Sequence, residues 1–164
     1  MLETERLTLR KFTLADVTAF MALGSHPDII RYTGRTAIKS LADAEIAMRS
    51  SVLKDYQQNG LGRLACVCKE SGKIIGFAGL KYVAQLGEVD IGYRFFPEYW
   101  GQGLATEVSQ LLLHYGRETL KLERIVGIVD TKNQASVRVL EKLGMVFEKT
   151  VRLDFSPDDL ALYV

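Results

Sequence analysis

The spacing of apolar residues divides the chain into strands and helices. Residues 5–11 alternate between apolar and polar side chains, with Leu7 and Leu9 on one face, which predicts a first strand. Residues 125–129 are apolar on both faces, as is typical of a central strand. By the same criteria, further strands are expected at residues 61–69, 73–83, 88–96, 145–155 and 160–164.

Four helices are predicted from apolar residues that recur every three or four positions. They cover residues 13–24, 40–59, 103–118 and 133–143. Their ends carry the expected capping residues, namely Thr13 with Asp16, Ser40 with Asp43, the turn Asn59-Gly60, Asn133 as an N-cap and Gly144 as a stop.

The order of these elements gives the fold class, which is α/β in the broad sense (α+β). One strand, two helices, three strands, a helix, a strand, a helix and two strands follow one another along the chain. This order is not a regular alternation, so it predicts a mixed sheet of about seven strands with helices on its faces. The 164 residues fit one domain, residues 1–164.

Composition narrows the class of protein. Twenty-one Lys and Arg against 20 Asp and Glu give a formal charge of +1, which argues against a broad basic face for nucleic acid. No apolar run approaches a membrane span, and the first 12 residues are too charged for a signal peptide, so we expect a cytoplasmic protein with no membrane partner. Cys66 and Cys68 lack a further cysteine as partner, and His26 and His114 have no ligand spacing to them. We therefore expect two small apolar side chains and no metal site.

The segment around Gly101 and Gly103 carries the strongest candidate chemistry. A predicted strand ends at residue 96, and a strong helix then begins among small residues. The first N–H groups of a helix have no partner within it and its dipole favours anions, so three or four of them could hold a diphosphate. The alternative is that the glycines only make a tight turn. The spacing of a P-loop is absent, and Thr106 stands where a dinucleotide fold needs its third glycine.

Several segments together resemble a known family. The first strand reads Glu5-Arg6-Leu7-Thr8-Leu9-Arg10, the fourth contains Asp90-Ile91-Gly92-Tyr93, and the loop reads Tyr99-Trp100-Gly101-Gln102-Gly103-Leu104-Ala105-Thr106-Glu107. The last helix runs from Asn133-Gln134-Ala135-Ser136 to Leu143-Gly144, and residues 159–163 close the chain. In this order and spacing they resemble the GNAT acetyltransferase superfamily and, within it, the RimJ/RimL-like branch.

The resemblance implies a mostly antiparallel central sheet with helices on both faces, splayed between the fourth and fifth predicted strands. It also implies acetyl-CoA as the acyl donor. The pantetheine arm would pair with main-chain groups near Phe95 and Phe96. The implied diphosphate ligands are the amides of Gln102, Gly103, Leu104, Ala105 and Thr106. On the last helix, Asn133 and Ser136 would face the pantetheine or thiol end, and Arg138 or Lys142 would reach the adenosine 3′-phosphate.

Two positions depart from the superfamily's pattern. Trp100 stands where the loop often begins with Gln or Arg, a change that matters little if backbone amides bind the phosphates. Leu140 stands at the position of the tyrosine that many members use to protonate the leaving thiolate. Because leucine cannot donate a proton, the proton would come from Ser136, from water or from the amine itself.

The inferred reaction is direct attack of an amine on the thioester, with an N–H near Phe95 stabilising the oxyanion. The amine must be neutral, and Asp90 and Glu88 are the candidate bases, directly or through water; the alternative for each is a solvated strand face. An α-amine has a pKa of about 7.8 and a lysine of about 10.4, a difference worth about 3.5 kcal/mol. Weak base assistance therefore favours an α-amine, on a protein N-terminus or a small molecule.

Two functions from different classes remain open. The first is an acetyl-CoA-dependent N-acetyltransferase, which the acidic strand face, Asn133 and Ser136 favour. The second is a non-catalytic CoA-binding or regulatory domain, which the absence of the tyrosine at Leu140 keeps open. The expected partners are acetyl-CoA and an amine acceptor. The sequence leaves open the identity of the acceptor, the length of the acyl chain and whether the chain forms a homodimer.

Overall fold

Eight strands form two sheets in the computed structural model, which describes residues 1–164. The larger sheet is antiparallel, in the order β1 (Leu2–Glu3), β2 (Leu7–Arg10), β3 (Gly62–Cys68), β4 (Ile74–Val83) and β5 (Glu88–Phe95). The smaller sheet is also antiparallel, with β8 (Leu160–Tyr163) between β6 (Gly127–Val129) and β7 (Phe147–Val151).

The two sheets meet at one point. Asp90 of β5 and Val126, just before β6, form a single parallel bridge. The Ile91 N–H donates to the Val126 carbonyl (2.8 Å), and the Val126 N–H donates to the Val89 carbonyl (2.9 Å). The predicted fold class and its splay are confirmed. The single sheet of about seven strands is instead two sheets, because β5 and β6 pair over one residue only, and β1 is too short for an alternating pattern to reveal.

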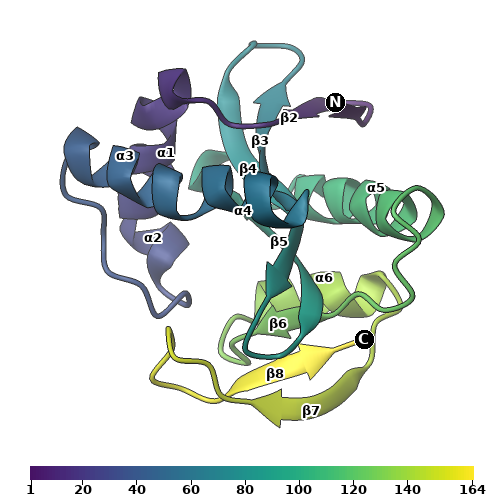
Figure 1. The fold of residues 1–164 in the computed structure, drawn as a ribbon. Coiled ribbons are helices and arrows are strands. Elements are labelled where there is room, and N and C mark those ends of the chain that lie inside the picture. The colour runs from purple at the N-terminus through teal and green to yellow at the C-terminus, as the bar shows by residue number, and fades with distance from the viewer.

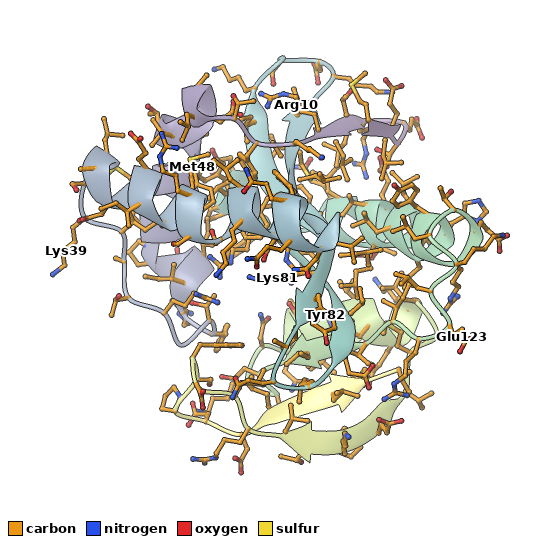
Figure 2. All side chains as sticks on the ribbon, in the orientation of Figure 1. Arg10, Lys39, Met48, Lys81, Tyr82 and Glu123 are labelled. Atoms are coloured by element: carbon orange, nitrogen blue, oxygen red, sulfur yellow. The ribbon has the colours of Figure 1, made fainter.

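Helices cover both faces of the larger sheet (Figure 1). On one face α5 (Leu104–Glu118) packs against β4 and β5, and its buried stripe belongs to the main core of 19 residues. On the other face α1 (Val17–Ser25), α3 (Leu41–Ser50) and α4 (Val52–Asn59) enclose a second core around Phe12, Met48 and Ala65. Met48 of α3 is fully buried, whereas Lys39, in the preceding loop, extends outward in Figure 2. The last helix, α6 (Gln134–Lys142), packs on β6.

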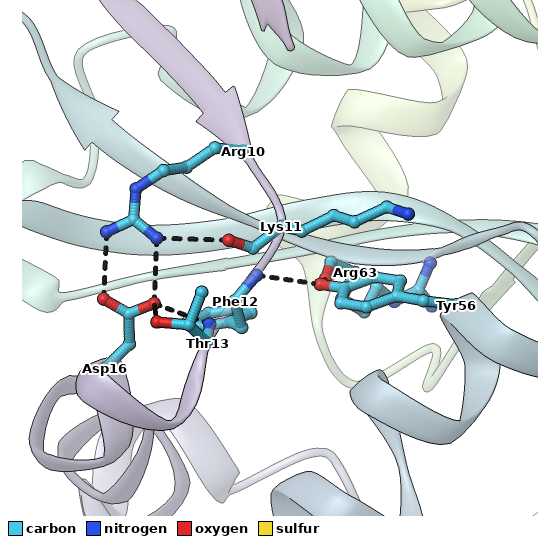
Figure 3. A network of polar contacts seen from close by, with 7 residues as sticks. All are labelled: Arg10, Lys11, Phe12, Thr13, Asp16, Tyr56 and Arg63. Carbon is cyan, nitrogen blue, oxygen red and sulfur yellow. Dashed lines mark hydrogen bonds and ion pairs between the residues drawn. The ribbon is translucent and has the colours of Figure 1, made fainter.

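The predicted caps are present. Asp16 Oδ2 accepts from the Thr13 N–H (2.8 Å), and both Asp16 oxygens accept from Arg10, as Figure 3 shows. This capping box opens a short 3-10 turn, Leu14–Asp16, before α1. Ser40 accepts from the Asp43 N–H at the start of α3 (3.0 Å).

The helix predicted over residues 40–59 is two helices. Ser51, with φ −122° and ψ −96°, separates α3 from α4. The Ser50 hydroxyl donates to the Ile46 carbonyl (2.9 Å), which satisfies the backbone at the break. The short α2 (Pro27–Ile30) was not predicted, because four residues carry no helical periodicity.

The two cysteines are free, with Cys66 fully buried and Cys68 half-buried, as predicted for small apolar side chains. No helix has both the length and the apolar character needed to cross a bilayer. No cluster of three or more His, Cys, Asp or Glu side chains is arranged to hold a metal ion.

Candidate functional site

The loop before α5 presents a row of unpaired amides. Gly103 caps the helix with φ +79°, a left-handed conformation that glycine adopts without strain. Hydrogen bonding within the helix begins when the Glu107 N–H donates to the Gly103 carbonyl (3.0 Å). The five preceding N–H groups have no acceptor in the protein; they are those of Gln102, Gly103, Leu104, Ala105 and Thr106. These are the five amides that the resemblance implied for a diphosphate.

Three side chains hold this loop in place. Arg6 donates to the Gln102 carbonyl (2.9 Å), and the Trp100 indole N–H donates to the Phe95 carbonyl (2.8 Å). The side-chain amide of Gln102 donates to the Glu98 carbonyl (3.1 Å). Arg6 also forms an ion pair with Glu107 in the first helical turn (2.6 Å). The Gln102 carbonyl is therefore satisfied by the protein, and the negative charge nearest the amides, that of Glu107, is neutralised.

One edge of β5 is open beside this loop. The Phe96 N–H donates to the Ile75 carbonyl (3.0 Å). Every second residue before it in β5 therefore also forms its main-chain hydrogen bonds with β4. The main-chain groups of Tyr93 and Phe95 face the other way, into the splay beyond the bridge to Val126. There the Phe95 carbonyl accepts from Trp100, while the Phe95 N–H and both groups of Tyr93 have no partner. Phe95 thus lies where expected, whereas Phe96 is turned toward β4 and does not face the splay.

The other wall of the splay is the start of α6. Asn133 accepts from the Ser136 N–H (3.3 Å), so its side chain caps the helix. The Tyr93 hydroxyl donates to the Ser136 hydroxyl oxygen (3.1 Å), which joins β5 to α6 across the splay. Burial raises the pKa of Tyr93 above its ordinary value, against the opposing effect of Ser136, so the phenol is protonated at neutral pH.

The remaining residues of α6 divide between surface and core. Arg138 and Lys142 are exposed and form no ion pair, so both remain available to a solvent-side phosphate. Leu140 is buried, and a Cβ on Gly127 would lie 2.5 Å from its methyl carbon. The leucine therefore fills space between α6 and β6, and no hydroxyl stands at that point.

Asp90 does not have the accessible position expected of a base. Its carboxylate is buried, forms an ion pair with Arg63 and accepts from the Ile128 N–H (3.1 Å). Burial raises the pKa of Asp90, and Arg63 opposes that effect. Arg63 itself lies over Gly92, where a Cβ would be 2.5 Å from its guanidinium. The N-terminal helices cover this strand face, and Asp90 therefore ties the two sheets together at their junction.

Glu88 is also occupied, and it is remote from the open edge. It accepts from Arg124 (2.8 Å), which also pairs with Glu148 of β7. It precedes Tyr93 by five residues, which is about 17 Å along an extended strand. Direct proton abstraction by Glu88 at the open edge is therefore ruled out by distance.

Sequence reasoning missed the residues that support the site. Arg6 acts across a separation of 96 residues, and such a contact leaves no local pattern. Trp100 was recognised only as a departure from the family, although its indole fixes the loop. Tyr93 belongs to the Asp90-Ile91-Gly92-Tyr93 motif, but no local pattern in the sequence indicates that its hydroxyl forms a hydrogen bond with Ser136.

Comparisons with known proteins identify the family and support the fold. Residues 6–146 match the acetyltransferase (GNAT) domain family. An uncharacterized N-acetyltransferase of Bacillus subtilis, YoaA, is 36% identical over 152 residues, which are 92% of this chain and 85% of the relative. The crystal structure of an acetyltransferase from Agrobacterium tumefaciens has a TM-score of 0.82 and 27% identity, over 99% of this chain and 91% of that one.

A spermidine N-acetyltransferase from Vibrio cholerae, solved with CoA and spermine, has a TM-score of 0.78 over 97% of this chain and 95% of that one; at 21% identity this likeness shows the fold. The family match and the relatives together establish that this chain belongs to the GNAT acetyltransferases and is an acetyl-CoA-dependent N-acetyltransferase.

Proposed function

We propose that this enzyme transfers the acetyl group of acetyl-CoA directly to an α-amine, on a protein N-terminus or a small molecule. One observation carries the donor half of the proposal: five consecutive unpaired amides, at residues 102–106, stand next to the open edge of β5. Unpaired main-chain donors and acceptors in this arrangement suit a diphosphate followed by an extended amide chain, which is the chemistry of CoA.

The protein groups available to CoA follow from this placement. Each hydrogen bond from an amide to a phosphate oxygen is worth about 1.5–3 kcal/mol, so three or four of the amides hold the diphosphate without a lysine. The pantetheine arm pairs with the free main-chain groups of Tyr93 and Phe95, as an added strand does. Asn133 and Ser136 border the thiol end, and Arg138 or Lys142 takes the 3′-phosphate.

Two groups at the open edge suit the chemical step. The Phe95 N–H, or that of Tyr93, donates to the oxygen of the thioester carbonyl as negative charge develops there. The Ser136 hydroxyl supplies the proton that the leaving thiolate takes up and is reprotonated by the phenol of Tyr93, and the proton released by the attacking amine returns to that phenol through water. The Tyr93–Ser136 pair thus replaces, as proton donor to the thiolate, the tyrosine that many members have at the position of Leu140.

The choice of an α-amine rests on the absence of a free base. Asp90 is held by Arg63 and Ile128, and Glu88 is held by Arg124 far from the open edge. An α-amine, with a pKa of about 7.8, has a sizeable neutral fraction at physiological pH and needs little help, whereas a lysine, with a pKa of about 10.4, needs a strong base. The motif resemblance to the RimJ/RimL-like branch supports the same acceptor class.

The family match and the N-acetyltransferase relatives decide against the non-catalytic CoA-binding domain that the sequence alone left open. Leu140 is buried where many members have a tyrosine, so turnover depends wholly on Ser136 and its neighbours. Thiol release tests this directly, because a domain that only binds CoA would release none.

The test combines calorimetry of CoA binding with a thiol-release assay against a panel of amines. Gly103→Val should weaken CoA binding at least tenfold, because a branched side chain crowds the amides and the position has φ +79°. Gly72→Val is the matched control: it introduces a branched residue at φ +69° in the β3–β4 hairpin and should leave CoA affinity unchanged. Equal CoA affinity in wild type and Gly103→Val would contradict the loop assignment. CoA binding without thiol release from any amine would favour the non-catalytic domain.

A further inference from the structure

Arg94 is a half-buried arginine without a partner. It lies on the face of β5 opposite Tyr93 and Phe95, and its guanidinium lies over the Phe77 ring, 5.2 Å from the ring centre. It forms no hydrogen bond and no ion pair with any residue of the protein. Such an arrangement is costly, because the Phe77 ring replaces only part of the hydration that a guanidinium loses when it is removed from water.

The other arginines show how unusual this is. Seven of the eleven form an ion pair with a carboxylate; they are Arg6, Arg10, Arg31, Arg49, Arg63, Arg124 and Arg152. Three of the remaining four are Arg35, Arg117 and Arg138, and all three are exposed to solvent. Arg94 alone is both unpaired and withdrawn from the surface.

Further positive charge gathers around Arg94. Burial, together with the charges of Arg35 and Arg63, lowers the pKa of Arg94 to about 10. Arg63 is compensated by Asp90, but Arg35 has no carboxylate partner and stacks on Phe155, 5.1 Å from the ring centre. Two uncompensated guanidinium groups therefore face the same region, from β5 and from the loop between α2 and α3.

The position of Arg94 links this charge to the reaction. Its neighbours in sequence, Tyr93 and Phe95, present the unpaired main chain that faces the acyl donor. Because successive Cα atoms are only about 3.8 Å apart, Arg94 is anchored directly between the two residues whose main chain faces the acyl donor. The nitrogens of Arg94 also remain accessible to solvent. Asp55 Oδ2 is the one fully buried polar side-chain atom that lacks a hydrogen-bond partner, so the unpartnered nitrogens of Arg94 are not fully buried.

We propose that Arg94, assisted by Arg35, binds an anionic group of the acceptor, a carboxylate or a phosphate, close to the amine that is acetylated. This inference rests on the proposed function and narrows its substrate class. The preferred acceptors are α-amines that carry an oxyanion, either an acidic residue next to a peptide N-terminus or the anionic group of a small amine. Polyamines, which bring only positive charge, are poor acceptors.

The experiment compares acceptors matched in the basicity of the α-amine. The peptide pair is Ser-Glu-Ala amide and Ser-Gln-Ala amide; the small-molecule pair is the α-amides of glutamic acid and of glutamine; spermidine is the cationic acceptor. Wild type should show a kcat/KM about 10- to 150-fold higher for the acidic member of at least one pair, the range expected for a charge-assisted hydrogen bond. The pair that shows the larger ratio identifies the source of the anion.

Variants at Arg94 then locate the effect. Arg94→Gln should abolish the preference by lowering kcat/KM for the acidic acceptors much more than for the neutral ones, whereas Arg94→Lys should restore part of it. Arg117→Gln, which removes an exposed unpaired arginine at the end of α5, should keep the full preference. Equal rates for both members of both pairs, or an equal loss for all acceptors in Arg94→Gln, would each overturn the inference and leave the proposed function standing. Spermidine as the best acceptor would overturn the inference and also the α-amine part of the proposed function, while the assignment of the CoA site would stand.

A second measurement needs no turnover. The N-acetylated acidic and neutral peptides are titrated into the CoA complex by calorimetry. Tighter binding of the acidic product, lost in Arg94→Gln, supports the inference even if no thiol is released, an outcome that counts against the proposed function alone. Equal affinity for the two products overturns it.

Discussion

Asp90 offers a sharp test of whether a carboxylate in the acidic strand motif serves structure or chemistry. Asp90→Ala removes the partner of Arg63 and the acceptor of the Ile128 N–H, both at the junction of the two sheets. The side chains of Asp90 and Arg63 are only 10% and 15% exposed, so the pair is a buried one. Removing one member of a buried pair leaves an uncompensated charge and costs about 3–5 kcal/mol.

This cost converts into a melting temperature. For a domain of this size 1 kcal/mol shifts Tm by about 2–4 °C, so Asp90→Ala should melt about 6–20 °C lower than wild type. The assay is thermal unfolding by circular dichroism, with urea unfolding as a check on the free energy. Arg63→Met combined with Asp90→Leu should recover much of the loss, because both charges leave together.

Glu88→Gln is the comparison variant, since its pair with Arg124 lies at the surface and its loss should leave Tm close to that of wild type. The structural reasoning is refuted if Asp90→Asn keeps the wild-type Tm while kcat falls and the pH–rate profile loses its acidic limb. That result would return Asp90 to the role of a base.

Two further results are expected. Arg10 holds the pKa of Asp16 below its usual value. The pair therefore stabilises the fold above the unfolded pKa of about 3.9, and this stabilisation is lost as the pH falls through the lower folded pKa. In urea unfolding, Asp16→Asn should be less stable than wild type at pH 7 and equal to it near pH 2. Hydrogen bonds from Ser71 lower the pKa of Cys68, whereas burial raises the pKa of Cys66. Iodoacetamide should therefore alkylate Cys68 first, which peptide mass spectrometry would show, and equal labelling of the two cysteines would contradict this.

The parts of the fold that follow from local chemistry could be predicted from the sequence. The Thr13–Asp16 box, the Ser40 cap and the stop at Gly144 are each specified by a few neighbouring residues, and each is present. The row of amides before α5 was predictable for the same reason, because a strand, a glycine turn and a strong helix follow one another within the chain.

The parts that depend on long-range packing could not be predicted. The alternation in β5 places Asp90 and Arg94 on one face, but it does not show that distant helices cover that face. The sequence indicated either a base or a solvated strand face for Asp90 and gave no sign of the buried ion pair, since its partner Arg63 comes from another strand. Burial of a charge is a property of what packs over it, and that is set by residues far away in the sequence.

The bond from Arg6 to the Gln102 carbonyl has a consequence for how the enzyme is made. At a synthesis rate of about 5–20 residues per second, the ribosome needs about 5–20 s to extend the nascent chain from the first of these residues to the second. A fragment that begins after the first strand would keep the whole glycine motif but lose the guanidinium that orients it. In the proposed function, the loop that holds the diphosphate is therefore complete only after both ends of that span have met.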